Sequence, residues 1–480
     1  MAAPPLDLAI VGGGIAGTWL AARMAESSPD WSIELLERTD RIGGRLRTMH
    51  VPGLEHPIEL GGMRYITSHE LVQEVVEAEK IPVRPFDTHG GPERSFLRGR
   101  FGGGPADPAA AAGYDLDDRE RGRSPVQLLV DALDAIVPGA AALSLDDWRE
   151  RRATGRFRGR ALTDWSLAEA GGAVRSAEGW AAATDAFGYD SGINLQNAGT
   201  ALPYLLGAGN PGGETRVPLA GMDRIPGALA DRFRATGGTV GLGAEVVRLD
   251  VTEGAAVLTL APGRTVVARR VVLALPMPAL TRLAAASPAL DAPVHRRLYA
   301  AVGGYPAMKL YAWFDRPWWR GVDGTLVNRA TTDLPIRKVF YFDEGPNRPA
   351  AMLAMFTDAR HTTPWIDLAG GASNGEPAPP AMLTGVLSQL RALHPGLTVP
   401  DPSGSALMHW GADPAEVAWH FWRAGHNADE VMDLAVQPEP GVPIHFCGEV
   451  FSLDQAWAEG ALRSAARVRE RLLQGPVSRL

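Results

Sequence analysis

The chain has 480 residues, and its 45% hydrophobic, 21% charged and 7% aromatic content is that of a globular protein with a large core. Its net charge of −8 argues against nucleic acid or an anionic membrane as the main partner, because no broad cationic surface is expected. The one cysteine, Cys447, excludes an intrachain disulfide, and no His/Cys cluster indicates a metal site. Because no apolar run reaches membrane-spanning length, we expect a cytoplasmic protein that is not embedded in a membrane.

The N-terminal stretch has the pattern of a dinucleotide-binding unit. The apolar run Leu6–Val11 ends in the glycine-rich turn Gly12–Gly17, and the helix-like stretch Thr18–Met24 follows. A second apolar run, Trp31–Leu36, closes with an acid, Glu37. This order of strand, glycine turn, helix, strand and acid is the fingerprint in which the acid accepts hydrogen bonds from a ribose.

The glycine turn is predicted to hold the phosphates. Gly12 permits the tight turn, Gly14 lets the backbone approach a pyrophosphate, and Gly17 lets the helix pack closely on the strand. Ile15 and Ala16 open the helix, whose free N–H groups and positive dipole end face the phosphates.

A second glycine pair with an arginine follows the acid, in the sequence ERTDRIGGR. This stretch begins with Glu37 and Arg38 and ends with Gly44 and Arg45. A nicotinamide-binding domain does not require a second glycine pair and an arginine at this place. Together with VGGGIAG, the stretch resembles the FAD-binding signature of the flavin amine oxidase superfamily, which contains monoamine, polyamine and L-amino-acid oxidases. The resemblance implies that Arg38 belongs to the FAD site and that Gly44 and Arg45 pass close to the pyrophosphate.

A third stretch comprises Gly61, Gly62, Met63 and Arg64. In the superfamily this segment passes the flavin ring, and where the substrate is an amino acid it carries an arginine that grips the carboxylate. The sequence GGMR is similar to that of L-amino-acid oxidases, including the tryptophan oxidase of violacein biosynthesis. A guanidinium fork suits bidentate recognition of a carboxylate. The alternative role for Arg64 is a structural ion pair with Glu59 or Glu70.

The middle of the chain is predicted to be largely helical. Helices are expected at Leu71–Glu79, Pro125–Ile136, Ser144–Arg152, Leu162–Ala170, Ala177–Phe187 and Asp223–Thr236. Residues 99–123 are rich in Gly, Ala, Pro and charge and predict a mobile loop or an irregular insertion.

Strand patterns follow residue 239 and end in a buried strand, Val271–Leu275. Val246 matches a superfamily position whose backbone meets the adenine. From about Leu298, alternating apolar and polar residues with many aromatics predict an antiparallel sheet with one face lining a pocket, and a helix is expected at Met382–Leu393.

The last segment carries a Gly-Glu pair, Gly448 and Glu449, then Trp457 and a predicted helix at Ala458–Leu473. In the superfamily the pair reaches the ribityl chain, and the helix points its N-terminus at the flavin ring, which places Ala461 at the cofactor. A buried glutamate without a partner is costly, so we expect Glu449 to have one.

The resemblance also implies the catalytic residues. Lys309 matches a lysine that holds a water near the flavin and assists reoxidation by oxygen, and Trp457 matches one of two aromatic rings that bracket the substrate amine. The second ring is left open among Trp419, His420 and Trp422. The covalent attachment of monoamine oxidases uses a cysteine that the corresponding segment FWRAGHN lacks, so noncovalent FAD is expected.

The expected fold class is α/β, α+β overall, with a Rossmann-type FAD-binding domain of the amine oxidase and glutathione reductase class. That domain is predicted from residues 1–80, 216–295 and 436–480. A substrate domain of mixed antiparallel sheet at 296–435 and a helical subdomain at 81–215 complete the chain.

The favoured function is an L-amino-acid oxidase that turns a large or aromatic amino acid and O2 into an imino acid and H2O2. The alternatives are an amine or polyamine oxidase, a flavin amino-acid monooxygenase, and a flavin-binding scaffold without turnover. The partners are thus a small amino acid or amine and O2; the oligomeric state is open, a homodimer being one option.

Overall fold

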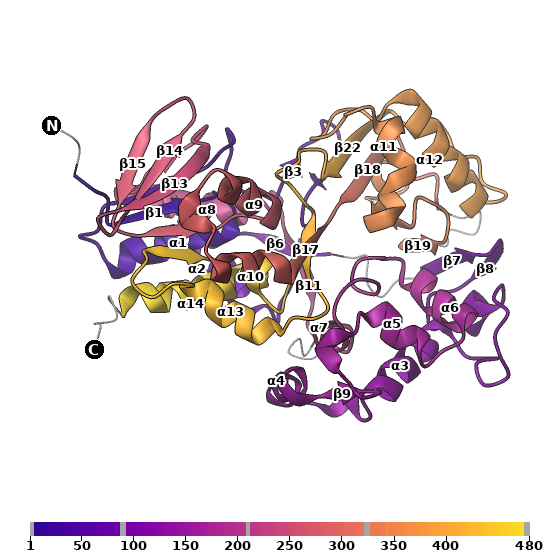
Figure 1. The fold of residues 1–480 in the computed structure, drawn as a ribbon. Coiled ribbons are helices and arrows are strands. Elements are labelled where there is room, and N and C mark those ends of the chain that lie inside the picture. Colours follow the sequence, from indigo (N-terminus) through magenta and orange to yellow (C-terminus); the bar gives the residue numbers. More distant parts are fainter. Residues whose placement is uncertain (1–3, 87–92, 208–211, 321–326, 343, 475–480) are drawn as a thin grey trace.

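The computed structural model describes residues 4–86, 93–207, 212–320, 327–342 and 344–474. A five-stranded parallel sheet lies at one end of the molecule (Figure 1), and its strands come from three distant parts of the chain. In spatial order they are β12 (Thr239–Gly241), β2 (Ile33–Leu36), β1 (Leu8–Val11), β16 (Val271–Leu273) and β24 (Ile444–Phe446). Every neighbouring pair is parallel, as a Rossmann-type domain requires.

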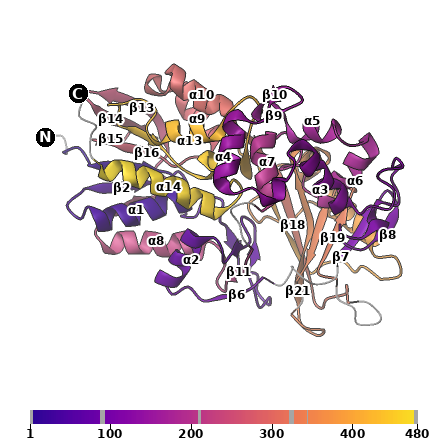
Figure 2. The same cartoon turned by 90° about the horizontal axis from the view of Figure 1, so that it is seen from below.

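Both faces of the sheet are buried, because the side chains that alternate between them are apolar on each face. Leu8 and Ile10 of β1 belong to one apolar core, and Ala9 and Val11 belong to another. The first core is covered by helices packed side by side (Figure 2): α1 (Ile15–Ser27), α8 (Arg224–Ala235), α14 (Ala458–Leu473) and α2 (Glu70–Ala78). The second is covered by an antiparallel sheet of β13 (Val246–Thr252), β14 (Ala255–Leu260) and β15 (Thr265–Ala268).

A seven-stranded sheet forms the second half of the molecule. Its order is β22 (Gly404–Trp410), β18 (Ala307–Phe314), β21 (Ala350–Asp358), β20 (Lys338–Tyr341), β19 (Arg329–Thr332), β7 (Glu93–Leu97) and β8 (Arg100–Gly102). All pairs are antiparallel except β19 with β7. One face packs on α11 (Thr363–Ala369) and α12 (Pro380–Leu393), and the other face carries Lys309 and Phe356 to the cavity described below. The predicted antiparallel sheet with one pocket-lining face is confirmed.

A helical lobe packs below this sheet (Figure 1). It contains α3 (Pro125–Ile136), α4 (Leu145–Thr154), α5 (Leu167–Gly172), α6 (Ala177–Phe187) and α7 (Ala198–Leu205). The predicted single helix at Leu162–Ala170 is wrong. Trp165 is extended and donates its indole N–H to the Phe157 carbonyl, and Ser166 caps a new helix, so a 3-10 turn at Leu162–Asp164 is separated from α5.

Residues 99–123, predicted as a loop or irregular insertion, are mostly irregular, yet the first of them form β8 at the sheet edge and Pro108–Ala111 form a 3-10 turn.

The remaining helices are α9 (Met277–Ala285), α10 (Pro293–Ala301) and α13 (Ala428–Val436). The remaining strands are β3 (Thr48–Met49), β4 (Ile58–Glu59), β5 (Tyr65–Ile66), β6 (Val83–Pro85), β9 (Arg156–Phe157), β10 (Arg160–Ala161), β11 (Thr215–Pro218), β17 (Val302–Tyr305) and β23 (Trp419–Trp422). Within the described ranges, no helix is both long and apolar enough to cross a membrane.

Candidate active site

A cavity of about 600 Å³ runs from the carboxyl ends of the parallel strands to the seven-stranded sheet, a volume typical of ligand and cofactor sites. Of the residues predicted to bind cofactor or to act in catalysis, all but Gly17 line it. These are Gly12, Gly14, Ile15, Ala16, Glu37, Arg38, Gly44, Arg45, Gly61, Gly62, Met63, Arg64, Val246, Lys309, Gly448, Glu449, Trp457 and Ala461.

The glycine turn has the shape of a phosphate cradle. A Cβ atom on Gly14 would meet no protein atom within 4 Å and would project into the space beside the helix, whereas one on Gly12 would lie 2.4 Å from the Ala274 carbonyl oxygen. Gly14 is the N-cap of α1, and no side chain caps that helix, so its N-terminal dipole is directed at the cavity. Gly17 instead serves packing, because a Cβ there would lie 2.0 Å from the Gly12 carbonyl oxygen.

These two glycines give a matched pair of variants. Gly14→Ala is expected to leave the free energy of unfolding of the cofactor-free chain unchanged, because φ is −73° and space is open, but to weaken FAD binding roughly tenfold by filling the cradle. Gly17→Ala is expected to destabilise the fold by about 1–3 kcal/mol through overpacking. Urea unfolding and FAD titration of both variants check this, and a destabilised Gly14→Ala chain with normal FAD affinity would contradict it.

Glu37 and Arg38 point to opposite sides of the strand end. The Glu37 Oε2 atom accepts a hydrogen bond from the Gly13 N–H at 2.7 Å, which fixes the carboxylate at the cavity wall. Arg38 forms ion pairs with Asp413 at 2.7 Å and Glu416 at 3.2 Å. Arg38 therefore lines the cavity while it clamps the loop that joins β22 to β23.

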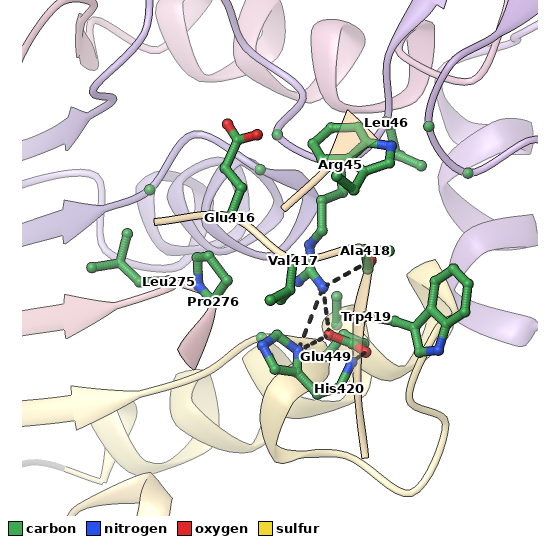
Figure 3. Close-up of a pocket in the computed structure, with 18 of the residues that line it drawn as sticks. Arg45, Leu46, Leu275, Pro276, Glu416, Val417, Ala418, Trp419, His420 and Glu449 are labelled. Carbon is green, nitrogen blue, oxygen red and sulfur yellow. Dashed lines mark hydrogen bonds and ion pairs between the residues drawn. The ribbon is translucent and has the colours of Figure 1, made fainter. Parts of the chain in front are cut away.

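Arg45, Glu449 and His420 meet in the middle of the cavity wall (Figure 3). The Glu449 Oε2 atom lies 2.8 Å from Arg45 Nη1 and 2.6 Å from His420 Nδ1. His420 Nε2 accepts the Met277 N–H at 3.0 Å, so the ring is the neutral tautomer that donates from Nδ1. Burial acts to raise the pKa of Glu449, but the Arg45 guanidinium and His420 outweigh it and hold the pKa below its usual range.

The partner expected for Glu449 is thus supplied by the protein itself, through Arg45 and His420. Arg45 keeps 30% of its side chain exposed while lining the cavity, which suits a cation that also meets a pyrophosphate. The His420 ring is fully buried in this cluster and does not act as an aromatic wall.

Lys309 lies on the cavity face of β18 with its ammonium group buried. Nζ donates to the Glu59 carbonyl at 3.0 Å and also to the Gly61 carbonyl. Burial lowers its pKa to about 7, while the Glu59 carboxylate raises it and Arg64 lowers it further. Tyr311, two residues along the same strand, donates its hydroxyl to the same Glu59 carbonyl at 3.0 Å. The lysine is held as a group whose charge changes near neutral pH.

Arg64 has no carboxylate within ion-pairing distance in the described part of the chain. Glu59 uses its carboxylate elsewhere: Oε1 accepts the Met222 N–H and Oε2 accepts the Thr48 hydroxyl, both at 2.9 Å. The guanidinium lies 5.3 Å from the centre of the Phe86 ring, and its Nη1 is buried without a hydrogen-bond acceptor. The Tyr189 side chain also interacts with this guanidinium, but no carboxylate pairs with it in the described ranges, so the position suits an anionic ligand.

Aromatic rings surround the cavity near Arg64 and Lys309, and we call them the aromatic end: Phe187, Tyr189, Tyr204, Phe356, Trp419 and Trp457. The Phe356 ring lies parallel to Trp419 with centroids 6.1 Å apart and edge-on to Tyr189 at 5.4 Å. Trp457 donates its indole N–H to the Tyr204 hydroxyl at 3.3 Å. Of the three residues left open for the second ring, Trp419 presents its ring here (Figure 3), whereas Trp422 is fully buried and bonds to Ser452.

Several lining residues escaped sequence reasoning. Arg41 supports the loop of the second glycine pair by donating to the Gly44 carbonyl at 2.5 Å and the Leu46 carbonyl at 3.2 Å, and its place within ERTDRIGGR was an available signal. Phe356 lies in β21, whose nine residues are all buried, so no apolar–polar alternation marks it as a cavity residue. Tyr189 and Tyr204 come from irregular or helical segments around α7, where no periodicity marks a cavity residue.

Cys447 is fully buried behind β24 and is not among the cavity-lining residues, and burial raises its pKa to about 12. It is a thiol packed in the apolar core. Noncovalent attachment of the cofactor stays a prediction, which denaturation and filtration test directly: the flavin should leave with the filtrate.

A phosphate cradle at the ends of parallel strands, leading to a buried lysine, an arginine with no carboxylate partner in the described ranges, and an aromatic end, defines a dinucleotide-dependent oxidoreductase. More specifically, the chain belongs to the family of flavin-containing amine oxidoreductases, whose family model matches residues 15–473. The cofactor is therefore FAD, and the chain is an enzyme that acts on amines.

Several proteins are similar in sequence to this chain over nearly its whole length. Aplysianin-A of Aplysia kurodai is 28% identical over 98% of this chain and 90% of its own length. Achacin of Lissachatina fulica is 25% identical over 97% and 93%, and mouse L-amino-acid oxidase is 25% identical over 98% and 71%.

Solved structures share the fold. A putrescine oxidase variant superposes with a TM-score of 0.74 at 18% identity, covering 98% of this chain and 100% of that one. Cyclohexylamine oxidase from Brevibacterium oxydans IH-35A gives a TM-score of 0.71 at 19% identity, with 98% and 100% covered.

The cavity fits FAD along its length. The glycine turn and α1 would hold the pyrophosphate, Glu37 the ribose, Val246 the adenine region, and the N-terminus of α14 the ring. Bound FAD supplies a two-electron acceptor that passes electrons on to oxygen.

Proposed function

We propose that the chain is an FAD-dependent L-amino-acid oxidase for large or aromatic amino acids. Overall, the amino acid, O2 and water give a 2-oxo acid, ammonia and H2O2, with a hydride leaving the substrate Cα. The observation that carries the proposal is Arg64, a cation at the aromatic end with a buried Nη1 that has no acceptor. A substrate carboxylate would satisfy it through a charge-assisted pair.

The aromatic end and Lys309 take the other roles in the proposed site. The aromatic end provides flat apolar walls for a large side chain, with Trp419 and Trp457 as the rings beside the amine. Lys309, whose carbonyl contacts fix Nζ at the cavity wall, holds or moves a proton there. Water is excluded by the same apolar walls, which strengthens the grip of Arg64 on the carboxylate.

The charges in the cavity disfavour a diamine as substrate. Among the lining residues that the structure describes, the carboxylates are Glu37, Glu245, Glu416 and Glu449. Three of them pair with arginines along the FAD path, Glu245 with Arg282, Glu416 with Arg38 and Glu449 with Arg45, and Glu37 bonds the cradle. A distal ammonium at the aromatic end would therefore have no anionic partner, and Arg64 would repel it.

A peroxide assay tests the proposal. The purified holoenzyme is expected to release H2O2 with L-phenylalanine, L-tyrosine or L-tryptophan and not with putrescine or a simple monoamine. Activity restricted to amines would contradict it. Product analysis separates the monooxygenase alternative, because a monooxygenase gives a carboxamide and CO2 in place of a 2-oxo acid and H2O2.

A further inference from the structure

Glu449 lies where the two ends of the cavity meet. It follows β24 and Gly448, whose φ of +121° turns the chain, and only 4% of the residue is exposed. Both carboxylate oxygens are used, and they serve different neighbours. Oε2 faces Arg45 at 2.8 Å and the His420 ring, whereas Oε1 accepts the His420 backbone N–H at 3.0 Å and the Ala456 N–H at 2.8 Å.

Ala456 has a backbone that needs this support. Its φ is +70°, in the left-handed region that disfavours residues with a Cβ atom, so the surroundings must hold it there. The hydrogen bond from its N–H to Glu449 Oε1 is one such restraint. Ala456 directly precedes Trp457, the N-cap of α14, so its conformation sets the direction in which the Trp457 ring leaves the chain.

The Trp457 ring also contacts two residues from distant parts of the chain, His69 and Tyr204. The His69 ring meets it edge-on, with centroids 4.8 Å apart and planes at 71°, and Tyr204 accepts its indole N–H. His69 is 5% exposed and stands at the start of α2, whose first turn also donates the Leu71 and Val72 N–H groups to Glu459 of α14. The ring therefore has a defined seat, and Ala456 directs it there.

We propose that Glu449 is a positioning residue that joins the cofactor to the substrate wall: Oε2 orients Arg45 toward the pyrophosphate, and Oε1 holds the left-handed Ala456 that seats Trp457. The substrate side rests on the proposed function, in which Trp457 is a wall for the amino acid. The two oxygens make the two duties separable by mutation.

Glu449→Gln separates them, because the amide keeps an oxygen for the Ala456 and His420 N–H groups but presents an amino group to Arg45 and His420 Nδ1. We expect its FAD dissociation constant to rise at least tenfold while Trp457 stays in its seat. Glu449→Ala removes both carboxylate oxygens, so it should also displace Trp457. Ala456→Gly is the matched variant added to it: glycine adopts a φ of +70° without support, so the double variant should return Trp457 to its seat while the FAD dissociation constant stays raised.

The position of Trp457 is read in the full-length holoenzyme, at saturating FAD, from the 19F resonance of 5-fluorotryptophan, assigned with Trp457→Phe. That resonance should match wild type in Glu449→Gln, should shift or broaden in Glu449→Ala, and should return to its wild-type position in the Glu449→Ala, Ala456→Gly double variant. A resonance displaced equally in Glu449→Gln and Glu449→Ala, unmoved in Glu449→Ala, or still displaced in the double variant would overturn the proposal, as would an unchanged FAD affinity in Glu449→Gln. Neither readout requires turnover, so an enzyme inactive on amino acids would refute the proposed function and leave this inference standing.

Discussion

Replacing Arg64 by methionine is expected to lower kcat/KM for L-phenylalanine roughly 150-fold, because losing one partner of a buried charge pair costs about 3 kcal/mol. Methionine keeps an unbranched chain over the Phe86 ring but removes the cation. Arg64→Lys keeps the charge and loses the fork, so the loss should be smaller and should fall on KM.

The substrate provides the control for this variant. 2-Phenylethylamine has the same ring and amine as L-phenylalanine but no carboxylate, so its weak turnover should be unaffected or improved when Arg64 is removed. Steady-state kinetics with both substrates give the ratio directly. If both substrates lose activity to the same extent, Arg64 supports the fold of the aromatic end and does not recognise the carboxylate.

The cofactor half of the cavity could be predicted from sequence because its residues act through local geometry. A turn that needs Gly12, Gly14 and Gly17 within six positions can be recognised without knowing what lies opposite. The roles separate only in the structure: Gly14 faces open space and Gly17 faces a carbonyl. The same holds for Glu449, whose protein partners Arg45 and His420 stand 404 and 29 residues away from it in the chain.

The substrate half could be predicted only in part, because long-range packing decides it. The sequence could not choose between a carboxylate grip and an ion pair for Arg64, since that depended on where Met222 and Thr48 engage Glu59. It could not fix the register of β23, which decides that Trp419 faces the cavity and Trp422 the core. The break before α5 has a different origin, because Ser166 and Glu169 form a capping box, a local pattern that the sequence itself carries.

Lys309 connects the chemistry to pH. A lysine with a folded pKa of about 7 and an ordinary value near 10.5 binds its proton more weakly in the folded chain than in the unfolded chain. Below pH 7 both states are charged, and the folded state bears the full cost of a buried ammonium. Between pH 7 and 10.5 only the unfolded state keeps the proton, so this group makes the protein more stable as pH rises, by up to about 1.4 kcal/mol per unit.

Lys309→Met is therefore expected to be more stable relative to wild type at pH 6 than at pH 10, as denaturant unfolding at the two pH values would measure. The same variant should slow the oxygen-dependent half of turnover roughly 100-fold, because an ammonium at Nζ stabilises negative charge that develops on oxygen. In wild type that rate should fall as pH rises through 7, and in Lys309→Met it should be flat. Stopped-flow mixing of the substrate-reduced enzyme with oxygen gives the rate. A stability difference that does not change with pH would show that Lys309 keeps an ordinary pKa, and a pH-dependent rate in the variant would assign the titration to another group.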